Sequence, residues 1–160
     1  MTINEFFNKE NIMSKDKFAK ATFKDELEVV DYTKMGAIAL SRAFDNDEYV
    51  PLASGWGVEF AIVVTFLGLE PDGNVDGDAV FKAFVCYGLY DDFRNNYCTN
   101  ENRARMILRA EADLAELIED KRKQVENGGT FIAQIKRLFE KIATDETVLA
   151  KIDALVDNLE

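Results

Sequence analysis

The chain has 160 residues, which is enough for one domain with a substantial hydrophobic core. Because 48% of the residues are apolar, the composition excludes a disordered tail. The 19 basic and 30 acidic side chains give a net charge of −11, which opposes binding to nucleic acid or anionic membranes and favours a partner with a basic surface.

The sequence also lacks the residues that most enzyme sites need. It contains no histidine, and its two cysteines, Cys86 and Cys98, form no C-x-x-C pair. Ser-His-Asp and Cys-His catalytic arrangements are therefore impossible. There is no signal pattern at the amino terminus, and the longest apolar run, 60–69, is roughly half of a membrane span. We expect a cytoplasmic, non-enzymatic protein with no cofactor and no membrane contact.

The first 50 residues predict helices and part of a β-ribbon. Thr2 begins a capping-box pattern and a short helix. Residues 26–30 alternate and predict a strand, after which Asp31 is suited to cap a helix over 32–44. Residues 48–52 predict a second strand that pairs with 26–30.

The middle of the chain is strongly apolar. Residues 58–69 predict either a central buried helix or a buried strand, and we favour the helix because its neighbours are helical. After a loop at 70–78, the pattern predicts one helix to about Tyr97. Its predicted buried face contains Val80, Phe81, Phe84, Val85, Gly88, Leu89 and Phe93.

Residues 99–127 predict the longest helix, capped by Thr99 and ended by Gly128-Gly129. Two segments with the same apolar pattern follow and predict an antiparallel helical hairpin over 130–160. The sequence therefore predicts a mainly α-helical single domain of about six or seven helices with a possible two-stranded ribbon. Its parts are an amino-terminal arm (1–25), a central core (26–127) and the hairpin.

Residues 72–78 read D-G-N-V-D-G-D and resemble the first half of a calcium-binding loop. The position that needs a bidentate glutamate holds Ala83 instead. We interpret the segment as a turn whose aspartates cap the next helix. The alternative is a calcium site with ligands from Asp72, Asn74, Asp76 and Asp78.

Residues 145–160 carry five acids and one cation, Lys151. Such a surface can imitate nucleic-acid phosphates and block a basic protein. By contrast, charges of both signs alternate over 101–123, as in ordinary soluble helices. The candidate interaction surface contains Trp56, Asp145, Glu146, Asp153 and Asp157.

Three short motifs stand in a fixed order: V-D-Y at 30–32, a D-x-x-x-Y turn at 45–49, and E-D-K-R-K at 119–123. Over 26–127 this order resembles small structural or accessory proteins of tailed phages and prophages of low-GC bacteria. The resemblance implies a non-enzymatic protein that binds a protein partner, either in a virion or during its assembly in the host cytoplasm. The acidic charge supports an alternative, an anti-CRISPR-like inhibitor of a host defence nuclease. A homo-oligomer is compatible with either function.

Overall fold

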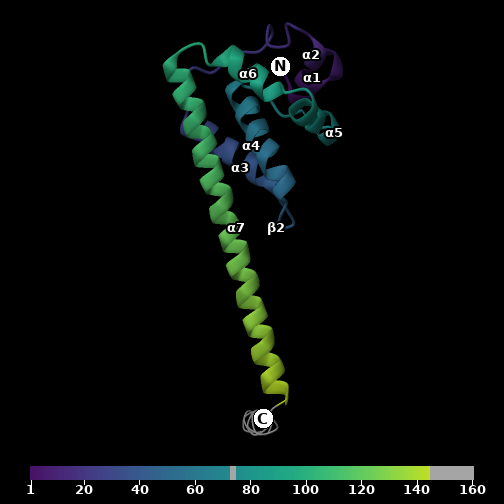
Figure 1. The fold of residues 1–160 in the computed structure, drawn as a ribbon, viewed down its shortest axis with the longest axis vertical. Helices are drawn as coiled ribbons and strands as arrows, with labels where there is room; N and C mark the ends of the chain where they lie inside the picture. Colours follow the sequence, from purple (N-terminus) through teal and green to yellow (C-terminus); the bar gives the residue numbers. More distant parts are fainter. Residues whose placement is uncertain (73–74, 145–160) are drawn as a thin grey trace. The chain divides into compact units, whose positions relative to one another are not determined.

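The computed structural model (Figure 1) describes residues 1–72 and 75–144, with side chains as far as Gly128. Over these residues the chain forms seven α-helices, one π-helix and a two-stranded antiparallel sheet. The predicted fold, mainly helical with a small ribbon, is therefore confirmed. The chain divides into two compact units, Met1–Asp120 and Lys121–Glu160.

The amino-terminal helices are α1 (Ile3–Phe7) and α2 (Lys9–Met13). The predicted capping box is present: the Thr2 hydroxyl accepts from the Glu5 amide at 3.2 Å, and the Glu5 carboxylate accepts from the Thr2 amide at 2.9 Å. A parallel bridge joins Thr2 to Glu70, and the amide that follows Thr2 donates to the Glu70 carbonyl at 2.9 Å. These bonds fasten α1 to the loop that follows α4.

Helix α3 (Val29–Ala43) begins where the sequence predicts a strand, so the predicted strand over 26–30 is wrong. Polar bonds at the helix start explain the difference. The Asp31 carboxylate accepts from the Glu28 amide at 3.1 Å and from Lys24 Nζ at 2.7 Å. Asp31 therefore lies inside the first turn rather than capping it. The bond from Lys24 holds the pKa of Asp31 below its ordinary value.

The ribbon pairs β1 (Phe44–Asp45) with β2 (Glu48–Tyr49). The predicted pairing of residues 48–52 with 26–30 is therefore wrong. The two loop residues, Asn46 and Asp47, have positive φ angles of 48° and 63°. Asn and Asp tolerate this left-handed conformation, which the commonest two-residue hairpin turn requires. A local hairpin consequently forms in place of the longer-range pair.

The apolar run forms the helix α4 (Pro51–Phe66), as favoured from its neighbours. Pro51 occupies the first turn, where its missing amide hydrogen costs nothing. Every residue from 60 to 66 is buried. Helices α3 and α4 pack directly against each other. A Cβ atom on Gly57 would lie only 2.7 Å from the Cβ atom of Arg42, so this glycine permits the close approach.

The single helix predicted to end near Tyr97 is wrong, because three elements replace it. They are α5 (Gly77–Phe81), the π-helix η1 (Lys82–Cys86) and α6 (Leu89–Tyr97). Gly88, which precedes α6, has a φ of 61°, a left-handed conformation that glycine adopts without strain.

The interruption also changes which side chains are buried. Val80, Phe84, Leu89 and Phe93 lie in the core as predicted, but Phe81 and Val85 are exposed. The buried residues Val80, Ala83 and Phe84 follow the helical spacing i, i+3, i+4 and define the face that meets the core. Phe81 precedes the π-helix and Val85 lies within it, and both are off that face.

Helix α7 (Glu101–Thr144) is the longest. Asn100 caps it instead of Thr99, and its side chain accepts from the Arg103 amide at 3.0 Å. The helix continues through Gly128-Gly129, so the predicted end there is wrong. Each glycine costs only about 1 kcal/mol relative to alanine, and the neighbouring turns are rich in good helix formers. The predicted hairpin turn and its second arm lie outside the described residues.

The core of the unit Met1–Asp120 consists largely of aromatic rings. Phe93 and Tyr97 stack with their ring centres 5.5 Å apart, and the Phe66 ring meets Tyr97 at 5.1 Å. For helix α7 the helical spacing in the sequence predicts a buried stripe of Ile107, Ala110, Leu114, Leu117, Ile118 and Lys121. Ile107, Ala110, Leu114 and Ile118 are buried and cover the core, whereas Leu117 is 38% exposed.

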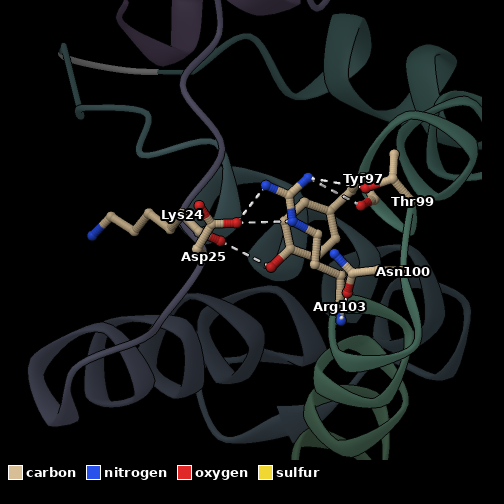
Figure 2. A network of polar contacts seen from close by, with 6 residues as sticks. All are labelled: Lys24, Asp25, Tyr97, Thr99, Asn100 and Arg103. Atoms are coloured by element: carbon tan, nitrogen blue, oxygen red, sulfur yellow. Dashed lines mark hydrogen bonds and ion pairs between the residues drawn. The ribbon is translucent and has the colours of Figure 1, made fainter.

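Arg103 fastens the segment before α3 to the start of α7 (Figure 2). Its Nε donates to Asp25 at 2.9 Å, and its guanidinium also donates to the Tyr97 carbonyl and the Thr99 hydroxyl, each at 3.4 Å. The guanidinium carbon lies 5.0 Å from the centre of the Tyr97 ring. The Tyr97 hydroxyl in turn donates to the Lys24 carbonyl at 2.8 Å. We interpret this network as structural, because its polar groups are occupied by one another.

Candidate interaction surface

Four apolar side chains from α4, α5 and η1 form a surface that we call the Trp56 patch: Leu52, Trp56, Phe81 and Val85. Leu52 is 91% exposed, Val85 56% and Phe81 43%. Trp56 is partly buried and packs against the core. A cluster of large apolar side chains on a surface marks a site where another molecule binds.

The α4 half of the patch follows from the helix start at Pro51. Leu52 and Trp56 are one turn apart and therefore share a face of the helix. The guanidinium of Arg42, on α3, lies 5.9 Å from the centre of the Trp56 ring and 5.0 Å from that of Phe60. Trp56 is thus held by a cation from α3 and by the core. An anchor that is already ordered loses little entropy when a partner binds.

The second half of the patch comes from the end of α5 and from the π-helix that follows it. The Phe81 ring meets the Trp56 ring edge-on, with 6.3 Å between ring centres. Phe84 points inward and meets the Phe60 ring at 6.1 Å. Val85, the next residue, faces solvent. Turns of π-helix inside helices occur frequently at functional sites, and this one places an apolar side chain in solvent.

Of the predicted surface residues, only Trp56 falls among the described residues. Asp145, Glu146, Asp153 and Asp157 lie outside them. The other members of the patch were missed from the sequence. Leu52 lies in a predicted strand. Two signals nevertheless favour a helix start here: the proline just before it, and its i, i+4 spacing to Trp56. Phe81 and Val85 belong to the predicted buried face, but the face that meets the core is narrower and contains Val80, Ala83 and Phe84.

The D-G-N-V-D-G-D segment starts a helix, as the turn interpretation predicts. Asp76 caps α5 and accepts from the amides of Asp78 and Ala79 at 3.0 and 3.3 Å. Asp72 accepts from the Asn4 amide at 3.1 Å. Asn74 lies outside the described residues. Among the described residues, no three His, Cys, Asp or Glu side chains are grouped so that they could hold a metal ion.

A group of ionisable side chains from α4, α6 and α7 lies apart from the Trp56 patch. The Tyr90 hydroxyl donates to the Glu111 carboxylate at 2.7 Å, and Arg94 lies 3.6 Å from the same oxygen. Burial raises the pKa of Glu59, and the negative charges of Asp91 and Glu111 add to the effect. Carboxylates in unlike environments can divide acid and base roles. Here Glu111 is occupied by two partners, so we interpret the group as structural.

Within the described part of the chain, no helix is both long enough and apolar enough to span a bilayer. Compared with known proteins, the chain matches no family model, no curated protein and no solved structure.

Proposed function

We propose that the protein acts without catalysis, by binding a protein partner through the Trp56 patch. The observation that carries this proposal is the grouping of Leu52, Phe81 and Val85 in solvent around a fixed tryptophan. Covering an apolar side chain of this size completely contributes roughly 1.5 to 3 kcal/mol, and the covered fraction scales that gain. Tryptophan is also one of the residues that most often contribute a large share of the binding energy at protein interfaces.

The proposed setting is a tailed phage or prophage, where the protein is part of the virion or assists its assembly. The support is the resemblance carried by the V-D-Y, D-x-x-x-Y and E-D-K-R-K motifs. Assembly subunits hold one another by apolar anchors, which agrees with the chemistry of the patch. The partner should present an apolar anchor with basic residues around it, because this chain carries a net charge of −11.

The test is affinity capture from host and infected-cell lysates, followed by quantification of the captured protein. Leu52→Lys places a charge at the centre of the contact and should reduce capture about tenfold or more. Val29→Lys is the matched control, because Val29 is also an apolar helix residue and is 84% exposed. Capture that persists with Leu52→Lys, or that Val29→Lys reduces equally, contradicts the proposal.

A second candidate function is inhibition of a host defence nuclease by an acidic surface. The net charge of −11 favours it, and its predicted carriers are Asp145, Glu146, Asp153 and Asp157. Ionic strength separates the two functions. Salt screens contacts between exposed charges but strengthens or spares apolar burial. If moderate salt releases the captured partner and the Leu52→Lys variant still captures it, the result supports inhibition of a nuclease instead.

A further inference from the structure

A groove of about 610 Å³ is lined by one face of α3, one face of α4 and the loop after α4. This volume lies within the range of small-molecule sites, roughly 300 to 1,000 Å³. Most of its wall is apolar, which is also typical of such sites. The apolar side chains include Ile3, Ile38, Phe60, Val64 and Leu69.

The charge of the groove differs from that of the chain as a whole. Three cations line it, Lys24, Lys34 and Arg42, together with the acids Asp31 and Glu70. Lys24 is paired with Asp31 at 2.7 Å. Among the described residues, neither Lys34 nor Arg42 has a carboxylate within ion-pair distance. In a chain with a net charge of −11, two unpaired cations in one groove indicate an anionic ligand.

Two buried polar atoms point to the same place. Among the described side chains, Arg42 Nε and Thr65 Oγ1 are buried and have no hydrogen-bond partner, and both residues line this groove. Thr65 is only 7% exposed. A buried donor without an acceptor is costly, so such atoms are rare in folded proteins. Two of them in one groove wall indicate acceptor oxygens that a ligand supplies.

The positions of these donors define two polar ends. Helices α3 and α4 are joined by the tight ribbon and pack antiparallel, with Gly57 against Arg42. Eight residues further along α4 is Thr65, and eight residues earlier along α3 is Lys34. Thr65 and Lys34 therefore lie at the same level. At 1.5 Å per residue, this level is about 12 Å from Arg42. One end has the Arg42 guanidinium, whose Nε is the unpartnered donor, and the other end has Lys34 together with the unpartnered Thr65 hydroxyl.

We propose that the groove binds an α,ω-dicarboxylate with an apolar chain. One carboxylate accepts hydrogen bonds from Arg42, and the other accepts from Lys34 and Thr65. The apolar chain covers Ile38, Phe60 and Val64 between the two ends. Guanidinium and ammonium bonds to carboxylates are among the strongest that side chains make, and the partly enclosed groove strengthens them. This inference does not rest on the proposed function, although the groove and the Trp56 patch share Arg42, which lies over the Trp56 ring.

Trp56 supplies a direct readout, because it is the one tryptophan of the chain and Arg42 lies over its ring. A carboxylate bound to Arg42 should change the Trp56 fluorescence. Decanedioate is the probe, since its extended chain is long enough to reach both ends. Decanoate has one carboxylate and succinate lacks the chain, so both should bind about tenfold more weakly or worse. Calorimetric titration checks the stoichiometry, which should be one per chain.

The variants separate the two ends of the groove. Lys34→Gln removes one cation, so it should weaken the binding of decanedioate about tenfold and leave the binding of decanoate nearly unchanged. The variant should then bind the two probes with equal affinity. Ala37→Phe adds a ring to an exposed helix position on the groove wall and should block both probes. Lys20→Gln, at an exposed lysine outside the groove, should change nothing. Circular dichroism confirms that each variant is folded.

Three results would overturn the proposal. The first is an absence of saturable decanedioate binding to the folded protein. The second is equal affinity of the wild type for decanoate and decanedioate, which would show that only one end holds an anion. The third is unchanged binding in Ala37→Phe, which would place the ligand elsewhere. None of these results depends on capture of a protein partner.

Discussion

Helix α4 and the segment Gly77–Tyr97 are both rich in apolar residues, but only α4 is a regular helix. In α4 the residues from 60 to 66 are buried on every side, so their position around the axis matters little. In the second segment, a π-helix and a left-handed Gly88 interrupt the period. Phe81, at the end of α5, and Val85, in the π-helix, lie in solvent and form half of the Trp56 patch. The comparison teaches that an apolar run is buried throughout when its helix is central, whereas a segment at the edge divides its apolar residues between core and surface.

The largest expected effect separates two phenylalanines, one from each region. Phe66 in α4 is fully buried, and Phe66→Ala should lower the free energy of unfolding by about 3 to 5 kcal/mol because it leaves a cavity. Phe81→Ala removes a ring that is 43% exposed and should cost about 1 kcal/mol or less. Urea unfolding followed by circular dichroism measures both values. Similar losses in the two variants would show that Phe81 belongs to the core.

A smaller effect tests how closely α3 and α4 pack. Gly57→Ala places a Cβ atom 2.7 Å from the Cβ atom of Arg42, so the helices must separate, at a cost of about 1 to 3 kcal/mol. Gly55→Ala is the matched control in the same helix. A Cβ atom there meets nothing within 4 Å, so the higher helix propensity of alanine should stabilise the protein by roughly 0.5 to 1 kcal/mol. Thermal unfolding that shifts in the same direction for both variants would contradict this packing.

Sequence reasoning reaches the features of this fold that short-range signals determine. The Thr2 capping box, the capping of α5 by Asp76 and the buried stripe of α7 all follow from a few neighbouring residues. The hairpin turn was also readable, because Asn46-Asp47 suits the left-handed loop of a two-residue hairpin. The alternation over 26–30 nevertheless predicts a strand there, and pairing 48–52 with that strand excludes the local hairpin. Gly128-Gly129 predicts a helix end that does not occur. The low helix propensity of two glycines is outweighed by the helical preference of the residues on either side.

The candidate sites were harder to predict, because their residues come from different helices. Trp56 stands out in the sequence, but its contact with Phe81 depends on how two separate helices, α4 and α5, are placed by the fold. In the groove, Lys34 and Thr65 share a level only because α3 and α4 are antiparallel. No spacing within one segment contains that information. A sequence can indicate which residues are available for binding, whereas packing determines which of them meet.

The smallest effect concerns Tyr97, at the end of the interrupted segment. Its hydroxyl donates to the Lys24 carbonyl at 2.8 Å, so Tyr97→Phe should cost about 1 kcal/mol at neutral pH. Burial raises the pKa of Tyr97 to about 12. The unfolded chain therefore loses this proton first, at about pH 10, and the stability that Tyr97 contributes falls as the pH rises from about 10 towards 12.

Tyr97→Phe cannot ionise, so its deficit relative to the wild type should shrink over that pH range. Urea unfolding of both proteins at a series of alkaline pH values measures the difference, and titration of the lysines affects both proteins alike. Burial also raises the pKa of Tyr90, so Tyr90→Phe should show a trend of the same sign. A difference between wild type and Tyr97→Phe that stays constant from pH 8 to about 12 would mean that the hydroxyl is open to water. The Tyr97 bond to Lys24 would then not hold the segment before α3 against α6.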